Sequence, residues 1–270
     1  MKSVYTGGEK VAEFESYDEL RVGDSKPAFI YEGNELVYPN PVKDGLVLWY
    51  DFSGRTNADS QRGIAEDLSG NGNHGTLQNF NYTPESGYDK NKLLFDGIDD
   101  YINIPKNESH EIIGGITIEQ TIRKLDDHDV SDGYGWDWLF NNGENSFAIR
   151  GYNLYLNPSG QLAFSYGESS FTTEYKPEIG DFFHVSASWN AEKHIVIIVN
   201  GVVIYDKLQS TLSPQISRFP IRIGKASYYA ATPHLTAAIY STKLYNRPLT
   251  AEEIAHNYAI EKERFNIQEV

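Results

Sequence analysis

The amino-acid sequence predicts an all-β protein built from two antiparallel sheets packed face to face. Short apolar segments recur along most of the 270 residues, with glycine, asparagine and proline between them, as in antiparallel sandwiches. Residues 115–123 alternate apolar and polar side chains with the period of a strand that has one apolar face. The chain also contains 19 Tyr, 13 Phe and 4 Trp, and aromatic residues favour strands.

The bulk composition limits the possible partners. A net charge of −15 and a pI of about 4.8 argue against nucleic acid and anionic membranes. Because there is no cysteine, disulfides and thiolate metal sites are excluded. No run of about 18 apolar residues exists, so we expect no membrane insertion. The first residues lack the apolar core of a secretory signal. We therefore expect that the protein acts in the cytosol, that it is released by cell lysis, or that a leader is missing from this sequence.

Residues 1–43 differ from the rest of the chain. Two short β-type patches, 28–31 and 35–38, flank Glu32-Gly33-Asn34, which predicts a hairpin. Two prolines around Asn40 then predict a stiff linker. Because this segment has too few apolar residues for its own core, we expect an arm that packs on another chain. The alternative is a small sheet added to the main domain, residues 44–270.

The main domain is expected to begin with the strand 45–52, whose almost continuous apolar character indicates burial on both faces. Asn200-Gly201 predicts a type I′ turn inside a hairpin. Thr250, with Glu253 three residues later, predicts the start of a short C-terminal helix. Other strands are expected at residues 92–95, 101–104, 115–123, 138–140, 147–150, 154–156, 162–166, 171–175 and 182–190. The hairpin spans 195–205, and a closing segment starts at 221–224 and ends with 237–250.

Two stretches rich in turn-forming residues, 67–75 and 95–101, lie between apolar segments. Three glycines and two asparagines in the first stretch favour turns with positive φ angles. Carboxylate and amide oxygens at this spacing are also the donors that Ca²⁺ prefers. The alternative is that these residues serve only to form turns. The candidate calcium ligands are Asp67, Asn71, Asn73 and Asp99, with Asp96 and Asp100 in reserve.

A long acidic loop, 126–135, precedes two tryptophans. Exposed aromatic rings can stack on sugars, so this combination predicts the rim of a carbohydrate site. The alternative is a solvated loop with both tryptophans packed inward. The candidate carbohydrate-binding residues are Tyr134, Trp136, Trp138, Tyr228 and Tyr229.

Three motifs, in order along the chain, resemble LamG-like domains of the concanavalin A-like lectin/glucanase superfamily. The first is Asp-Leu-Ser-Gly-Asn-Gly-Asn-His-Gly-Thr-Leu (67–77), followed by Leu-Phe-Asp-Gly-Ile-Asp-Asp-Tyr-Ile (94–102). The second is the hairpin with His-Val-Ser-Ala-Ser-Trp (184–189) and Val-Asn-Gly-Val (199–202), and the third is 245–258. The resemblance spans about Asp44 to Tyr258. It implies a two-sheet antiparallel jelly roll with a short C-terminal helix, a structural Ca²⁺, and a structural place for His184 in a strand.

The same superfamily includes β-glucanases, so catalysis has to be considered. Retaining glycosidases need two carboxyl groups about 5–5.5 Å apart, which residues i and i+2 of one strand can provide. The glucanase relatives carry such acidic runs on one strand. Here the residues two and four positions after Glu119 are Thr121 and Arg123, so no second carboxylate follows it on the same face of the strand. We therefore predict a non-enzymatic protein with no catalytic residues; a glycan-active hydrolase is the alternative.

The resemblance implies two compatible non-catalytic roles. One is recognition of a glycan on a host or environmental surface. The other is architectural, because domains with this signature occur in bacterial surface proteins and in phage virions. We expect a virion fibre or decoration protein that forms a homo-oligomer and contacts other virion proteins through residues 1–43. It would be assembled in the host cytoplasm and released by lysis; the alternative is an extracellular or surface-associated bacterial adhesin.

Overall fold

The computed structural model describes residues 40–126, 135–143, 150–190, 192, 194–209, 215–227 and 235–267, and the backbone of four strands nearer the N-terminus. The chain forms two compact units, Met1–Pro41 and Val42–Val270. In the first unit, β1 (Lys2–Thr6) pairs with β2 (Glu9–Phe14), and β3 (Ile30–Glu32) pairs with β4 (Glu35–Tyr38). Both pairs are antiparallel two-stranded sheets. The second pair confirms the hairpin predicted around residues 32–34.

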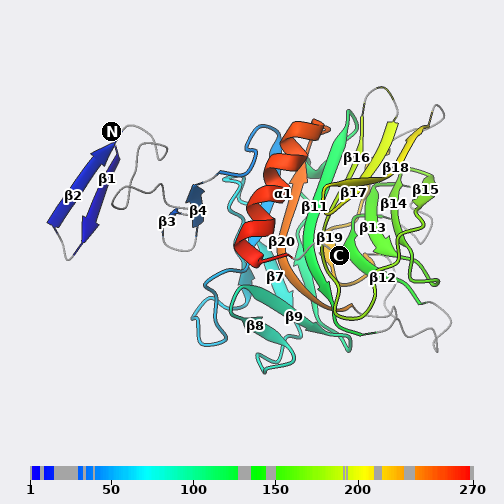
Figure 1. Cartoon of the computed structure of the whole chain (residues 1–270). Helices are drawn as coiled ribbons and strands as arrows, with labels where there is room; N and C mark the ends of the chain where they lie inside the picture. The colour runs from blue at the N-terminus through cyan, green and yellow to red at the C-terminus, as the bar shows by residue number, and fades with distance from the viewer. Residues whose placement is uncertain are drawn as a thin grey trace. The chain divides into compact units, whose positions relative to one another are not determined.

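The second unit is the predicted antiparallel two-sheet sandwich (Figure 1). We call its layers the first and the second sheet. The first sheet has the order β18-β17-β16-β11-β20-β9-β8, and β5 pairs with β20. Its bounds are β5 (Leu46–Asp51), β8 (Gly87–Asp89), β9 (Lys92–Asp96), β11 (Ile116–Lys124), β16 (Phe182–Trp189), β17 (His194–Val199), β18 (Val202–Leu208) and β20 (Thr236–Tyr245).

The second sheet has the order β15-β14-β13-β12-β19-β10-β7-β6. A short 3₁₀ turn, η2 (Glu108–His110), follows β10 in the chain. The strand bounds are β6 (Ile64–Ala65), β7 (Gly75–Gln78), β10 (Tyr101–Ile104), β12 (Asp137–Asn141), β13 (Tyr152–Leu156), β14 (Leu162–Tyr166), β15 (Ser169–Thr172) and β19 (Ile221–Ile223).

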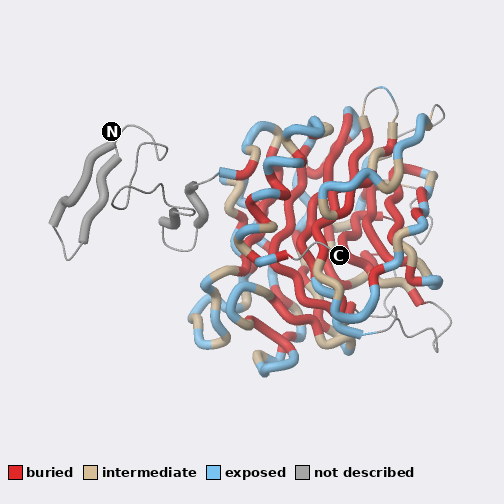
Figure 2. Tube along the Cα trace, viewed as in Figure 1, coloured by how far each residue is buried: buried red, intermediate tan, exposed pale blue. Residues whose placement is uncertain are grey.

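The hydrophobic core lies between the two sheets, where the strands in Figure 2 are coloured as buried. The alternation predicted for β11 is confirmed, because Ile116, Ile118 and Ile122 all enter this core. Gln120, on the same side of β11, is also buried and links the layers. Its Nε2 donates to the backbone oxygen of Leu139 at 3.0 Å, so a polar side chain is accommodated between the sheets by its hydrogen bonds.

The helix α1 (Ala251–Phe265) lies over the outer face of the first sheet, across β20 and β11 (Figure 1). Its predicted N-terminus is confirmed. Thr250 Oγ1 accepts a hydrogen bond from Glu253 N at 3.2 Å, and Glu253 Oε2 accepts one from Thr250 N at 2.9 Å. This capping box satisfies two backbone donors at the point where the helix starts. No described helix is long and apolar enough to cross a membrane.

Most other elements agree with the sequence predictions. Asn200 and Gly201 have φ angles of 50° and 78°, as a type I′ turn requires. The strand predicted at 171–175 instead ends at Thr172, because Thr173 Oγ1 donates to Leu162 O and accepts from Tyr175 N, which turns the chain away. The short strands β6, β7 and β8 were not predicted. Residues 147–149 of the strand predicted at 147–150 lie outside the described residues, and Arg150 lies in a bend.

Candidate functional site

On the second sheet, the side chains that point away from the core are polar and aromatic, and we call this side the outer face. Those on β12, β13 and β14 are buried, whereas Tyr101, Asn103 and Arg222 are half-buried. Strand pairing makes neighbours of residues far apart in sequence: Asn103 is opposite Arg222, which is opposite Asn141. A register shift between Trp138 and Phe140 lets both Trp138 and Asn141 point outward. The outer face contains Tyr101, Asn103, Trp138, Asn141, Asn153, Tyr155, Ala163, Ser165 and Arg222.

An aromatic cluster occupies one part of the outer face. The rings of Trp136 and Trp138 are stacked, with centroids 5.8 Å apart and an interplanar angle of 14°. Tyr155 packs against them at centroid distances of 5.1 and 5.2 Å. Trp138 and Tyr155 are each only 2% exposed, whereas Trp136 is half-buried. Trp136 is therefore the ring that reaches the surface, on a support formed by the other two.

Buried amides beside this cluster hold the adjoining loops in place. Asn153 Oδ1 accepts hydrogen bonds from Asn141 Nδ2 at 2.8 Å and from the backbone of Asn142 and Gly143 at 3.0 and 2.8 Å. Asn141 Oδ1 accepts one from Ser227 N at 2.6 Å. These bonds fix the segments that follow β12 and β19 against the outer face. The amides therefore position the site, and their bonded atoms are already satisfied.

Two cations flank one aromatic ring on the same face. Arg222 Cζ lies 5.3 Å, and Lys225 Nζ 5.0 Å, from the centroid of Tyr101. Arg222 Nη1 donates to the backbone oxygen of Ala226 at 3.0 Å, and Ala226 packs in the aromatic cluster. Burial lowers the pKa of Lys225, and repulsion by Arg222 lowers it further, while Asp99 opposes both effects. The cation pair and the aromatic cluster thus form one contiguous region.

The structure places two of the five predicted carbohydrate-binding residues together. Trp136 and Trp138 are in direct contact, but Trp138 is buried and supports its neighbour. Tyr134, Tyr228 and Tyr229 lie outside the described residues. Arg222 and Lys225 were not among the predicted site residues, because only the pairing of β10 with β19 brings Arg222 close to Tyr101.

Three of the predicted calcium ligands organise the turn 67–75. Asp67 Oδ1 accepts from the backbone of Trp49 and Ser69, and Oδ2 accepts from Asn73 N. Asn71 and Asn73 donate their side-chain amides to backbone oxygens of the segment that contains β5. The carboxylate oxygens of Asp67 are therefore already engaged, as the turn-forming alternative expects.

The fourth predicted ligand, Asp99, lies at the other end of β7. There, Asp96, Asp99 and Asp100 each offer a carboxylate oxygen, and these oxygens lie within 4.8 Å of one another. Asp100 is fully buried, and its Oδ1 has no hydrogen-bond partner in the described part of the chain. Burial raises the pKa of Asp100 to about 6. This cluster fits a cation better than the turn at Asp67 does, and calcium binding stays a prediction.

Comparison with known proteins agrees with the two-sheet architecture described above. Residues 96–255 match the Laminin_G_3 family model, described as the concanavalin A-like lectin/glucanases superfamily. The chain belongs to this superfamily. No curated protein matches it in sequence.

Solved structures with a similar fold include two kinds of larger protein. A Trypanosoma rangeli sialidase in complex with 2,3-difluorosialic acid has 17% identity and a TM-score of 0.58, over 83% of this chain and 34% of the sialidase. The binding domain of Paraclostridial Mosquitocidal Protein 1 has 19% identity and a TM-score of 0.57, over 83% and 53%. The botulinum neurotoxin serotype D binding domain has 15% identity and a TM-score of 0.56, over 82% and 52%. This chain thus spans about a third to a half of these proteins, and the likeness establishes the fold.

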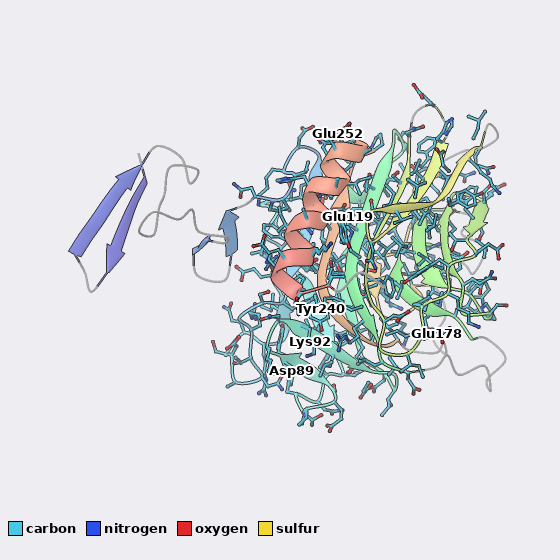
Figure 3. All side chains as sticks on the ribbon, viewed as in Figure 1. Asp89, Lys92, Glu119, Glu178, Tyr240 and Glu252 are labelled. Carbon is cyan, nitrogen blue, oxygen red and sulfur yellow. The ribbon has the colours of Figure 1, made fainter. Side chains whose placement is uncertain are left out.

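Because the superfamily includes glucanases, the position of Glu119, the acidic residue considered for catalysis, bears on enzymatic function. Glu119 lies beneath α1 in the first sheet (Figure 3) and is 1% exposed. Asn257 Nδ2 of the helix donates to its Oε2 at 2.7 Å, and His184 Nε2 lies 4.0 Å from its Oε1. Burial raises the pKa of Glu119 to about 7 and lowers that of His184 to about 3. Both residues are buried, and His184 lies within β16, in the structural position that the resemblance implied.

The same layer contains a buried ion pair that the sequence predictions missed. Lys243 Nζ contacts Glu261 Oε1 at 2.5 Å, and both side chains are 1% exposed. Glu261 Oε2 also accepts hydrogen bonds from Ser241 at 2.9 Å and Thr121 at 3.1 Å. A signal was present: Glu261 lies seven residues after Ile254 and therefore on the same face of the helix.

Proposed function

We propose that this domain binds carbohydrate through the outer face of the second sheet and does not catalyse a reaction. The observation that carries the proposal is the half-buried ring of Trp136, stacked on buried Trp138 and packed against Tyr155. A ring already fixed in place loses little conformational entropy when a ligand stacks on it. Membership of a superfamily that includes lectins supports the same assignment.

The position of the acidic residues supports the non-catalytic part of the proposal. Glu119, the strand carboxylate considered for catalysis, is buried under α1. Of the clustered acids, Asp100 is fully buried and engages the backbone of Asp96 at the turn between β9 and β10. A glycan-active hydrolase remains the competing function, and it would release new reducing ends from a bound oligosaccharide.

Replacing Trp136 with alanine is expected to weaken glycan binding by about tenfold or more, because central tryptophans commonly dominate binding energy. Binding is measured on a glycan array and then by calorimetry with the sugars that bind. Tyr205→Ala is the control, since Tyr205 is a half-buried ring on β18 of the other sheet. Both variants should retain a cooperative thermal transition.

Three results would contradict the proposal: an array on which the wild-type protein binds no glycan, unchanged binding by the Trp136 variant, or new reducing ends in the bound sugar. The first two would remove the recognition role or its site. The third would replace recognition with hydrolysis.

We also propose that residues 1–41 attach the domain to another chain, as an oligomerisation or anchoring element. The supporting observation is that β1–β2 and β3–β4 are separate two-stranded sheets. Such sheets are marginally stable alone in water, and their outer edges carry backbone groups that another strand can pair. A phage virion and a bacterial cell surface are the two settings we propose for such an element.

Deleting residues 1–41 is expected to reduce an oligomer to a monomer, because the second unit has its own core. The molar mass is measured by light scattering and the melting temperature by calorimetry. A full-length protein that is already monomeric, or a truncated one with the same oligomeric mass, would argue against this role.

A further inference from the structure

Arg222 and Lys225 are brought together although their charges repel. Both cations lie over the ring of Tyr101, at 5.3 and 5.0 Å from its centroid. The chain has 38 acidic and 23 basic residues, so carboxylates are plentiful. Nevertheless, within the described residues neither cation forms a salt bridge shorter than 4.0 Å. An anion bound beside either cation would offset this repulsion.

The guanidinium of Arg222 is held in position by hydrogen bonds that use only some of its N–H donors. Its Nη1 donates to Ala226 O at 3.0 Å, and its Nε lies 3.5 Å from Asn103 Oδ1. Arginine has five N–H donors, and Nη2 makes no hydrogen bond with any residue that the structure describes. A fixed guanidinium with donors to spare is suited to charge-assisted hydrogen bonds with a carboxylate or sulfate.

The cation pair adjoins the ring proposed to stack on sugar. Ala226, whose backbone oxygen anchors Arg222, packs in one cluster with Trp138 and Tyr155, and Trp136 lies against that cluster. The half-buried ring of Trp136 and the two positive charges therefore lie on the same side of the second sheet. A sugar that carries an anionic substituent is suited to both features.

We propose that the glycan bound on the outer face is acidic, and that Arg222 and Lys225 bind its carboxylate or sulfate group. The inference rests on the proposed carbohydrate-binding function and gives that function a substrate class. Because the attraction is electrostatic, binding should weaken as salt is added. It should also weaken at alkaline pH, where Lys225 loses its charge, since burial and Arg222 lower the pKa of this lysine against the opposing attraction of Asp99.

The test compares matched pairs of ligands: oligogalacturonate with its carboxyl-reduced form, and a sulfated galactan with its desulfated form. The wild-type protein is expected to prefer an acidic member by about tenfold or more, as hydrogen bonds to charged groups imply. Lys225→Met and Arg222→Gln should lose this preference. Lys207→Met is the matched control, because Lys207 lies 5.0 Å from the ring of Tyr205 on the first sheet and makes the same change in net charge.

The outcomes separate this inference from the function on which it rests. Equal binding of acidic and neutral partners, or an acidic preference that survives both substitutions, would overturn the acidic assignment and leave carbohydrate binding intact. Loss of the preference in Lys207→Met as well would show a general charge effect and would also overturn it. Failure to bind any glycan, on the array or in these pairs, would reject both.

Discussion

Asp67→Ala is expected to lower the free energy of unfolding by about 3–5 kcal/mol, because it leaves buried backbone donors without an acceptor. The carboxylate accepts from Trp49 N and Asn73 N, both at 2.9 Å, and from Ser69 N at 3.0 Å. Trp49 and Asn73 are buried, so water cannot replace the lost acceptor there without opening the structure. The measurement is urea denaturation at neutral pH.

Asp59→Ala provides the matched control. Asp59 also accepts from its own turn, at Thr56 N and Thr56 Oγ1, but it does so at the surface. We expect this control to change stability by less than about 1 kcal/mol. If the Asp67 variant were no less stable than the Asp59 variant, the carboxylate of Asp67 would not organise the turn 67–75.

Lys243→Met is expected to destabilise the protein by about 3–5 kcal/mol, the usual loss when one partner of a buried ion pair is removed. It would leave Glu261 buried without the cation that it contacts. Burial alone would raise the pKa of Glu261, but attraction to Lys243 and Arg264 outweighs it and lowers this pKa to about 2. Without Lys243, burial favours the protonated, neutral form of Glu261.

The pH dependence of this loss follows from two carboxyl groups. The lowered pKa of Glu261 stabilises the native wild-type protein above pH 4.5, and this contribution disappears as pH falls through about 2. Glu119 has the opposite sign: its pKa is raised to about 7, so stability falls as pH rises from 4.5 towards 7. Since Lys243 attracts both carboxylates, its removal should be less damaging at pH 5 than at pH 8.

Urea denaturation at these two pH values measures the effect. Lys106→Met serves as the control, because Lys106 pairs with Glu111 at 3.0 Å on the surface and should change stability by at most about 1 kcal/mol. Lys243→Met/Glu261→Gln should recover part of the loss. A Lys243 variant as stable as the Lys106 variant, or a loss that grows on acidification, would contradict this account.

Local sequence patterns were sufficient to predict most of the sandwich. The apolar alternation of β11, the positive φ angles at Asn200-Gly201 and the capping box at Thr250 are each set by a few adjacent residues. Where prediction failed, the deciding contact came from elsewhere in the chain. The strand β15 ends early because Thr173 bonds to Leu162, a residue eleven positions away.

The candidate site was harder to predict for the same reason. Trp136 and Trp138 are close in sequence, and their chemistry is visible there. Arg222 and Asn103 are separated by 119 positions and become neighbours only through strand register. Similarly, the polar side of β11 could be predicted, but its burial beneath α1 depends on a helix more than a hundred residues later.

The pairing of β5 with β20 joins an early part of the sandwich to a late one. Arg264 on α1 also contacts Asp51, across a sequence separation of 213 residues. During synthesis, β5 therefore cannot pair with β20 until nearly all of the domain has left the ribosome. Such distant closure slows folding and leaves apolar strand edges exposed to other chains in the meantime. Until β20 has been made, the unpaired edge of β5 is a position at which the nascent chain can associate with other chains.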